Sequence, residues 1–363
     1  MSLEKQDVFT LRWGIIGTGL IASWFVSDLV LDPSTHRNEP NLIHKVQAIG
    51  SSSHQKGTAF AQKHIPSTST SNGCSIYDSY AQVYTDPAVD IVYIATPTGL
   101  HFTNALDAIR AGKHVLCEKP MTITTSESEQ LIAAARAKGV FLMEALWTRF
   151  FPIAKELQRA LHEKKLIGDI TRVFVDFGLD MPLEKQKDGS RLVDLRLGAG
   201  CLLDIGIYAL TWARMALCGA KEDEGEEPAV RSAMVLKEGV DEEATVLLIQ
   251  QKMGRQAVCS ASYRYKSGKV FGRVEGSEGC IEIVGGAASK PESLVIRRKD
   301  GMETVRDFSF VGWGFFYEAD AVAMDIRDGR TENETMPLEE TVRVMRIMDE
   351  VRRQNGMKYP HEE

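Results

Sequence analysis

A glycine-rich turn near the start of the chain constrains the fold more than any other feature. The segment WGIIGTGLIA contains Gly17, Gly19 and Ala22 in a G-x-G-x-x-A pattern. A short apolar run, 11–16, precedes the turn, and an amphipathic run, 21–31, follows it. A strand, a glycine turn and a helix in this order predict the first unit of a dinucleotide-binding fold, because the glycines let a pyrophosphate approach the helix N-terminus.

The other residues of this turn are Thr18, Leu20 and Ile21. We expect them to line the bound dinucleotide together with the two glycines. The alternative is a turn that uses its glycines for packing alone.

The end of the second predicted strand, 45–50, bears on which dinucleotide binds. NAD-binding folds usually carry Asp or Glu there, which binds the ribose 2′-hydroxyl. This chain instead has Ser51, Ser52 and Ser53, with Lys56 nearby. We therefore predict that these side chains bind the 2′-phosphate of NADP, and that NAD is disfavoured. The serines can also cap the next helix.

Short β-like runs alternate with helical runs from residue 11 to about residue 145. The predicted strands are 11–16, 45–50, 90–95, 113–117 and 140–143, and the predicted helices are 21–31, 55–64, 101–111 and 126–138. Such alternation predicts a doubly wound parallel sheet, which is a Rossmann-type α/β domain.

The pattern changes after residue 149. One predicted helix, 153–165, precedes runs of alternating polar and apolar residues at 170–177, 229–236, 244–250, 256–263, 270–275, 280–284 and 293–298. Two further helices are expected at 315–328 and 338–354. We therefore predict a dinucleotide-binding domain at 1–148. A substrate-binding and dimerisation domain at 149–363 is expected to be α+β, with a mostly antiparallel open sheet.

Composition argues against several classes of protein. The formal net charge is −7 without any Lys/Arg run, so we expect no nucleic-acid partner. No stretch reaches about 18 uninterrupted apolar residues, so we expect no membrane partner. The six cysteines form no C-x-x-C pair and the histidines no H-x-x-x-H pair. These patterns are typical of a cytoplasmic protein with reduced thiols and without a metal site.

Two constellations could carry chemistry. Lys119 follows the fifth predicted strand, and ligands of doubly wound sheets bind at that end of the strands. Asp204 and Tyr208 are four residues apart and would share one face of a helix. The alternatives are a solvated turn at Lys119 and a buried tyrosine whose hydroxyl is hydrogen-bonded.

Several motifs together resemble the glucose–fructose oxidoreductase/inositol dehydrogenase (Gfo/Idh/MocA) family. They are GTGLIA at the glycine turn, ATPTGLH at 95–101, AGKHVLCEKP at 111–120 and LDIGIY at 203–208. The segment LMEALWTRFFP at 142–152 is similar to the branch of dimeric dihydrodiol dehydrogenases and NADP-dependent D-xylose 1-dehydrogenases. The resemblance extends from about residue 11 to about residue 355.

The resemblance implies roles for individual residues. Lys119 would be the catalytic lysine, and Tyr208, with Asp204 beside it, would be the general acid and base. These three residues and Phe150 would contact the substrate. Further cofactor contacts would come from Thr96, Pro97, His101, Glu118, Lys119, Trp147 and Arg149. Packing is the alternative role for the phenylalanines.

The function expected from this resemblance is NADP-dependent oxidation of the anomeric hydroxyl of a D-xylose-like aldose to a lactone, with hydride transfer to nicotinamide C4. A nearby ammonium would help Tyr208 to act as the base, because positive charge favours a phenolate. The alternatives are oxidation of trans-dihydrodiols to catechols, reduction of a carbonyl in the opposite direction, and a dinucleotide-sensing regulator without catalysis. A homodimer formed through the C-terminal sheet is expected.

Overall fold

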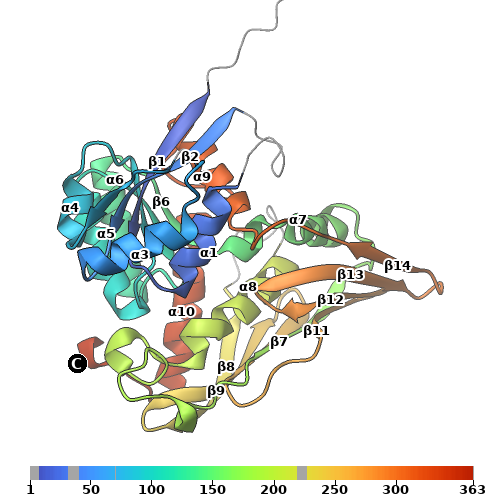
Figure 1. Cartoon of the computed structure of the whole chain (residues 1–363). Coiled ribbons are helices and arrows are strands. Elements are labelled where there is room, and N and C mark those ends of the chain that lie inside the picture. Colours follow the sequence, from blue (N-terminus) through green and yellow to red (C-terminus); the bar gives the residue numbers. More distant parts are fainter. Residues whose placement is uncertain (1–7, 32–40, 70, 219–226, 363) are drawn as a thin grey trace, which may run out of the picture. The chain divides into compact units, whose positions relative to one another are not determined.

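The computed structural model describes residues 8–31, 41–69, 71–218 and 227–362. The chain folds into two compact units. Unit 1 comprises Met1–Trp147 and Phe310–Val342, and unit 2 comprises Thr148–Ser309 and Arg343–Glu363. Figure 1 shows the helices and strands of both units, coloured along the sequence.

Unit 1 contains a parallel six-stranded sheet. Its strands are β1 (Phe9–Ile16), β2 (Leu42–Gly50), β3 (Ser75–Tyr77), β4 (Ile91–Ile94), β5 (His114–Glu118) and β6 (Leu142–Ala145). Their order in the sheet is β3-β2-β1-β4-β5-β6, and all five pairs are parallel. This is the strand order of a Rossmann fold, in which ligands bind where the order reverses, beyond the carboxyl ends of β1 and β4. The predicted fold class is confirmed.

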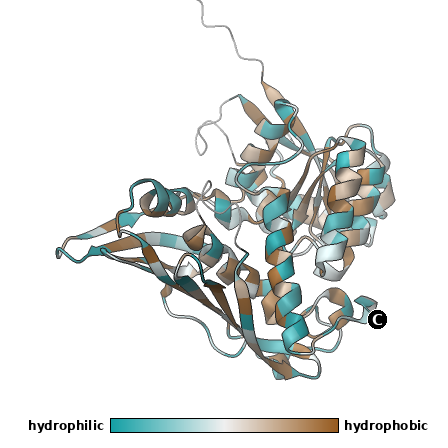
Figure 2. Ribbon diagram, turned by 180° about the vertical axis from the view of Figure 1, so that it is seen from behind, coloured by the Kyte–Doolittle hydropathy of each residue, from teal (hydrophilic) through white to brown (hydrophobic). Residues whose placement is uncertain are grey.

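Helices accompany the strands of unit 1. They are α1 (Leu20–Leu29), α3 (His54–His64), α4 (Tyr80–Thr85), α5 (His101–Arg110), α6 (Thr125–Lys138) and α9 (Phe316–Arg327). Helix α6 begins at a capping box between Thr124 and Glu127 and ends at left-handed Gly139. All four residues of β4 are buried, as expected for a strand covered on both faces. Brown predominates on the strands of this sheet (Figure 2).

The later segment 310–342 packs into unit 1, although we predicted that the second domain would contain it. The buried carboxylate of Asp28 on α1 accepts hydrogen bonds from the backbone N–H groups of Trp313, Gly314 and Phe315. In addition, Nε2 of His44 on β2 lies 2.8 Å from the Asp320 carboxylate on α9. These long-range polar contacts join α9 to the first domain, and local sequence patterns do not show them.

Unit 2 contains an eight-stranded sheet. Its strands are β7 (Ile170–Gly178), β8 (Ala229–Lys237), β9 (Val240–Gln250), β10 (Arg255–Ser262), β11 (Val270–Gly276), β12 (Gly279–Ala287), β13 (Lys290–Arg298) and β14 (Glu303–Asp307). The order is β14-β13-β12-β11-β7-β10-β9-β8. Among the described strands of this sheet, only β7 and β10 pair in parallel, which confirms the prediction of a mostly antiparallel sheet.

Helix α8 (Ile207–Leu217) contacts β7 and β10 of this sheet, and every residue of α8 is buried. Helix α7 (Pro152–Gln158) belongs to the same unit, whereas α10 (Leu338–Gln354) begins in unit 1 and continues in unit 2. Among the described residues, one helical stretch, 195–217, is apolar and long enough to cross a membrane, but 94% of its most apolar window is buried. Burial of this kind is typical of a core helix.

Candidate functional site

The glycine turn joins β1 to α1 at the point where the strand order reverses. Gly17 has a φ of +95°, and its N–H donates to the Gly50 carbonyl at 3.0 Å. A Cβ at Gly17 would lie 2.9 Å from the carbonyl oxygen of Ala95, so a larger residue would clash there. A Cβ at Gly19 would meet no atom within 4 Å, because this position faces open space.

The N-terminus of α1 is suited to binding a phosphate group. Its N-cap residue, Gly19, provides no side-chain cap, and the first turn carries no acidic residue. Thr18 and Ile21 are half-buried beside the turn, and Leu20 is 66% exposed. The backbone N–H groups of the first helical turn therefore favour an anion at this position.

The polar residues after β2 divide into a buried and an exposed group. Ser51 is buried, and its hydroxyl has no hydrogen-bond partner among the described residues. Ser52 is exposed and accepts a hydrogen bond from Nζ of Lys56 at 3.1 Å. Ser53 caps α3 by accepting from the Lys56 N–H at 3.3 Å. The unpartnered hydroxyl of Ser51 and the exposed Lys56 ammonium fit a phosphorylated ribose.

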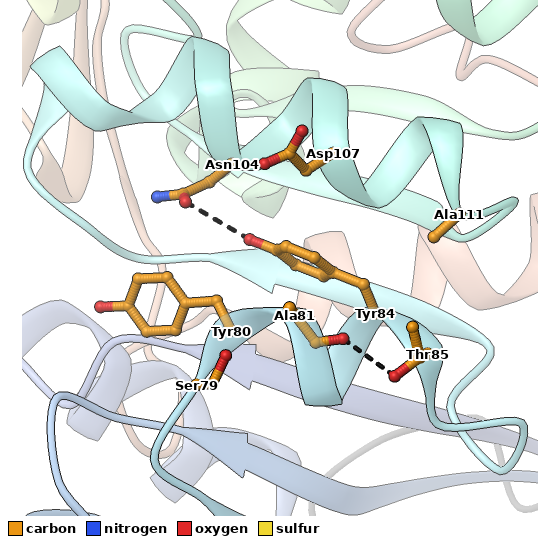
Figure 3. A pocket seen from close by; sticks show the side chains of 8 residues that line it. All are labelled: Ser79, Tyr80, Ala81, Tyr84, Thr85, Asn104, Asp107 and Ala111. Carbon is orange, nitrogen blue, oxygen red and sulfur yellow. Dashed lines mark hydrogen bonds between the residues drawn. The ribbon is translucent and has the colours of Figure 1, made fainter.

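The turn after β4 is held by a side chain that sequence reasoning missed. Asn104 on α5 donates from Nδ2 to the Thr96 hydroxyl at 3.1 Å and accepts from the Tyr84 hydroxyl at 3.4 Å. Tyr84 and Asn104 also line a pocket of about 450 Å³ between α4 and α5, where the tyrosine hydroxyl points toward the amide (Figure 3). Thr96 is thereby fixed in orientation, while Pro97 beside it is half-buried.

His101 lies in the core of unit 1. Its Nδ1 is 2.9 Å from the Pro120 carbonyl oxygen, and its Nε2 is 2.7 Å from the Thr96 carbonyl oxygen. Burial lowers the pKa of His101 to about 4, so the ring is neutral at neutral pH and donates to one of the two carbonyls. This geometry assigns His101 to joining the turns after β4 and β5, and the ring is only 1% exposed to any ligand.

Lys119 follows β5 directly and is half-buried. The buried carboxylate of Glu118 accepts hydrogen bonds from the Tyr93 hydroxyl and, at 3.2 Å, from the backbone N–H of Lys119. Burial raises the pKa of Glu118 to about 7, although the Tyr93 hydrogen bond and the Lys119 charge oppose this shift. Glu118 therefore holds the backbone at Lys119.

A second buried carboxyl group, that of Glu318, lies near Glu118. Glu318 on α9 is fully buried, and neither of its carboxyl oxygens has a hydrogen-bond partner among the described residues. Burial and the neighbouring Glu118 raise the pKa of Glu318 well above its ordinary value. The neutral, protonated form of Glu318 is therefore favoured. The sequence gives no signal for this, since Glu318 follows Glu118 by 200 residues.

The aromatic segment after β6 is largely buried. Trp147 stacks on Phe315 with ring centroids 4.2 Å apart, and both residues belong to unit 1. Arg149 and Phe150 belong to unit 2, where Arg149 is half-buried and Phe150 is 1% exposed. For Phe150 this burial favours the packing role that the sequence left open.

In unit 2, Asp204 and Tyr208 lie on one continuous helical segment. Residues Leu202–Gly206 form a π-helical turn that leads directly into α8. Tyr208 is 4% exposed, and its ring meets Phe177 of β7 edge-on at 5.6 Å. The predicted helix is therefore present, with a wider turn between the two residues.

The partners of Asp204 come from elsewhere in unit 2. The buried Tyr263 hydroxyl donates to Oδ2 of Asp204 at 2.8 Å and lies 3.2 Å from the Gly200 carbonyl. On the other oxygen, Nη1 of Arg191 lies 3.1 Å from Oδ1. Burial and the Asp204 charge raise the pKa of Tyr263 well above its usual range, so this phenol stays protonated. Sequence reasoning missed both partners.

Asp241 of β9 anchors the start of this helical segment. Its buried carboxylate accepts from the Leu202 N–H at 2.6 Å and from the Cys201 thiol at 3.3 Å. Gly200 has a φ of +125°, and a Cβ there would overlap this carboxylate. Burial raises the pKa of Asp241 to about 7. Across the part of the chain that the structure describes, no group of three or more His, Cys, Asp or Glu residues could hold a metal ion.

Comparison with known protein families agrees with this architecture. Residues 11–146 match the Gfo/Idh/MocA model described as an oxidoreductase family with an NAD-binding Rossmann fold. Residues 156–285 match the model of the C-terminal domain of the same family. The chain belongs to the Gfo/Idh/MocA family of oxidoreductases.

Individual proteins are similar to this chain over nearly its full length. The chain is 33% identical to the D-xylose 1-dehydrogenase (NADP(+)) of Hypocrea jecorina, over 99% of this chain and 95% of that protein. It is 34% identical to the trans-1,2-dihydrobenzene-1,2-diol dehydrogenase of Mus musculus, over 97% and 99% of the two chains. The crystal structure of the aldose-aldose oxidoreductase of Caulobacter crescentus is similar, with a TM-score of 0.77, 25% identity, and coverage of 95% and 97%.

Proposed function

We propose that this oxidoreductase uses NADP to oxidise the anomeric hydroxyl of a D-xylose-like aldose to a lactone. The observation that carries the proposal is the similarity to the NADP-dependent D-xylose 1-dehydrogenase, which spans 99% of the chain and therefore both units. The family assignment alone supports only the class of oxidoreductase.

The cofactor preference is argued from the residues around the glycine turn. The open position at Gly19 and the uncapped N-terminus of α1 suit a pyrophosphate. No carboxylate follows β2 directly. Lys56 and Ser52 are both exposed and hydrogen-bonded to each other, so the Lys56 ammonium is accessible to a 2′-phosphate. NADP, when bound, would accept the substrate hydride at nicotinamide C4. Thr96, Pro97, Glu118, Trp147 and Arg149 remain candidate cofactor contacts.

The chemistry of the protein is acid–base and electrostatic catalysis. Tyr208 takes the proton of the hydroxyl that is oxidised, while the Lys119 ammonium donates a hydrogen bond to the oxygen as negative charge develops on it. Asp204 lies one helical turn before Tyr208 and is held on both oxygens by Tyr263 and Arg191. The backbone at Lys119 is held by Glu118.

A second candidate substrate is a trans-dihydrodiol, which would be oxidised to a catechol. The observation that favours it is the 34% identity to the murine dihydrodiol dehydrogenase. The same residues would act on either substrate, because both reactions remove a proton from a hydroxyl and a hydride from the carbon that bears it.

The assembly and location of the enzyme are also proposed. The sheet of unit 2 exposes apolar side chains on three strands, namely Phe174, Val235, Leu236 and Val270. Exposed apolar surface of this kind favours association, so we propose a homodimer through this sheet. The free cysteines agree with a cytoplasmic enzyme.

The test is a substrate panel. Purified protein is mixed with NADP+ or NAD+ and with D-xylose, other aldoses or trans-1,2-dihydrobenzene-1,2-diol, and formation of reduced nicotinamide is followed by its absorbance. We expect the highest kcat/KM with an aldose and NADP+. Turnover of the diol alone would select the second candidate, and no turnover with any substrate would contradict the proposal.

A further inference from the structure

Asn104 on α5 links the turn after β4 to the neighbouring helix α4. Its Nδ2 donates to the Thr96 hydroxyl at 3.1 Å, and its Oδ1 accepts from the Tyr84 hydroxyl at 3.4 Å. All three side chains are buried, with exposed fractions of 9% for Asn104, 8% for Thr96 and 6% for Tyr84. They form a chain of hydrogen bonds that runs from α4 through α5 to the turn after β4.

The Thr96 end of this chain lies beside the glycine turn. A Cβ at Gly17 would be 3.5 Å from the backbone nitrogen of Thr96 and 2.9 Å from the carbonyl oxygen of Ala95. The turn after β4 therefore packs directly against the turn that we assign to the dinucleotide. Since β1 and β4 are neighbours where the strand order reverses, Thr96 lies at the edge of the sheet where a Rossmann fold binds its ligand.

The direction of the hydrogen bonds leaves one donor unused. Burial raises the pKa of Tyr84 above its usual range, so the phenol stays protonated and donates to the amide oxygen of Asn104. Figure 3 shows this oxygen facing the Tyr84 hydroxyl and the amide nitrogen facing away from it. The nitrogen donates to Thr96, whose hydroxyl oxygen accepts and whose own O–H remains to donate. Among the described residues, no group accepts a hydrogen bond from the Thr96 O–H.

The main chain of this turn is held by other contacts. Nε2 of His101 lies 2.7 Å from the Thr96 carbonyl oxygen, and the Ala95 N–H donates to the Ile16 carbonyl at 2.9 Å. The hydrogen bond from Asn104 instead reaches the Thr96 side chain. Its specific contribution is therefore the direction in which the Thr96 O–H can donate.

We propose that Asn104 is a positioning residue for the dinucleotide: by donating to the Thr96 hydroxyl oxygen, it directs the Thr96 O–H toward an oxygen of the bound cofactor. The ribose and the pyrophosphate both supply acceptor oxygens. This inference rests on the part of the proposed function that places a dinucleotide at the glycine turn, and it does not depend on the substrate. NADP+ and NAD+ share these oxygens, so both should respond equally.

The test compares two substitutions of Asn104 that treat Thr96 differently. Asn104→Ala removes both hydrogen bonds. Asn104→Asp keeps the shape and the acceptor for Tyr84, but an ionised carboxylate cannot donate, so the Thr96 O–H must turn toward it. Each substitution is made alone and together with Thr96→Val. The Kd values for NADP+ and NAD+ are measured by calorimetry at about pH 8, well above the usual carboxyl pKa.

Asn333→Ala is the matched control. Asn333 is another buried asparagine of unit 1, and it donates to Asp325 and accepts from the N–H groups of Thr335 and Met336. None of these partners is a proposed cofactor contact. Urea denaturation of every variant gives the free energy of unfolding, so that a loss of stability is distinguished from a loss of affinity.

We expect Asn104→Ala, Asn104→Asp and Thr96→Val each to raise the Kd of both dinucleotides about 10-fold, as for the loss of one hydrogen bond. In the Thr96→Val background, neither substitution of Asn104 should change the Kd further, because the donor that Asn104 directs is already absent. Asn333→Ala should lower the free energy of unfolding and keep the Kd of wild type.

Three outcomes would overturn the inference. A wild-type Kd in Asn104→Asp would mean that any hydrogen-bonded side chain suffices at this position. A full effect of Asn104→Ala or Asn104→Asp in the Thr96→Val background would mean that Asn104 acts through packing or charge. Binding of neither dinucleotide to wild type would contradict the inference and the cofactor assignment together.

Assays with the substrate panel separate the inference from the proposed reaction. The expected pattern of Kd values without turnover of any sugar or diol would support the inference and contradict the proposed oxidation. Turnover by wild type, with unchanged Kd values in the Asn104 variants, would do the reverse.

Discussion

The carboxylate of Asp241 lies 2.6 Å from the backbone nitrogen of Leu202, at the start of the helical segment that carries Asp204 and Tyr208. The Asp241 carboxylate accepts the hydrogen bond of this backbone N–H group. The Asp241 side chain is also fully buried, and burial disfavours its charged form. Its protonation therefore affects the stability of the segment.

The pKa of Asp241, raised to about 7, gives stability a defined pH dependence. The folded protein binds this proton more tightly than the unfolded chain, whose Asp pKa is about 3.9. The stabilisation from Asp241 is therefore complete below about pH 4 and lost as the pH rises to about 7. Relative to Asp241→Asn, wild type should lose roughly 2–4 kcal/mol between these values. Urea denaturation of both proteins across this range measures the difference, and a constant difference would show that Asp241 keeps an ordinary pKa.

Gly200→Ala should destabilise unit 2. The backbone at residue 200 has a φ of +125°, and the new Cβ would overlap the Asp241 carboxylate. We expect a loss of about 2–4 kcal/mol in the free energy of unfolding, because strain and overlap add. Gly189→Ala provides the control, since it also has a positive φ but open space around its Cβ. If both substitutions lowered the free energy of unfolding by the same amount, the overlap with the Asp241 carboxylate would not be the cause of the loss in Gly200→Ala.

Asp28→Ala should loosen the segment 310–342 from unit 1. The substitution leaves three backbone N–H groups, those of Trp313, Gly314 and Phe315, without their acceptor. The expected cost is about 3 kcal/mol or more. Tryptophan fluorescence reports on this region during urea denaturation, since Trp24 stacks on Trp313 at 4.1 Å. Asp28→Asn retains an acceptor and should lose less, and a loss as large as that of alanine would argue against these hydrogen bonds.

Lys56→Ala should weaken NADP+ binding without changing NAD+ binding. The substitution removes the ammonium that we assign to the 2′-phosphate, so the Kd for NADP+ should rise about 10-fold. Lys63→Ala, at the other end of α3, serves as the control. Calorimetric titration with both dinucleotides measures the effect. A loss of affinity shared by NADP+ and NAD+ would place Lys56 elsewhere in the cofactor site.

Much of the fold could be predicted from the sequence because its longer strands have clear periodicity. The alternation in 256–263 corresponds to β10, where every second residue is buried. Shorter elements were missed, including the three-residue β3, the six-residue α4 and β14. The placement of α9 in unit 1 depends on Asp28 and His44, which are more than 270 residues away from their partners.

The candidate site could be predicted only in part. The four-residue spacing of Asp204 and Tyr208 correctly indicated a common helix, because helical periodicity is local. Tyr263 and Arg191 could not be assigned to Asp204, since they lie 59 and 13 residues away in the sequence. One weak signal existed for Tyr263: a tyrosine at the buried phase of a strand needs a partner for its hydroxyl.

The most direct test of the proposed chemistry is single-turnover hydride transfer to NADP+ from the best substrate of the panel, measured for wild type, Tyr208→Phe and Lys119→Met. Calorimetric titration with NADP+ confirms in parallel that each variant is folded and binds cofactor. We predict that each substitution lowers the rate of hydride transfer at least about 100-fold, because each removes acid–base or electrostatic catalysis. A rate close to that of wild type in either variant, with cofactor bound, would contradict the role assigned to that residue.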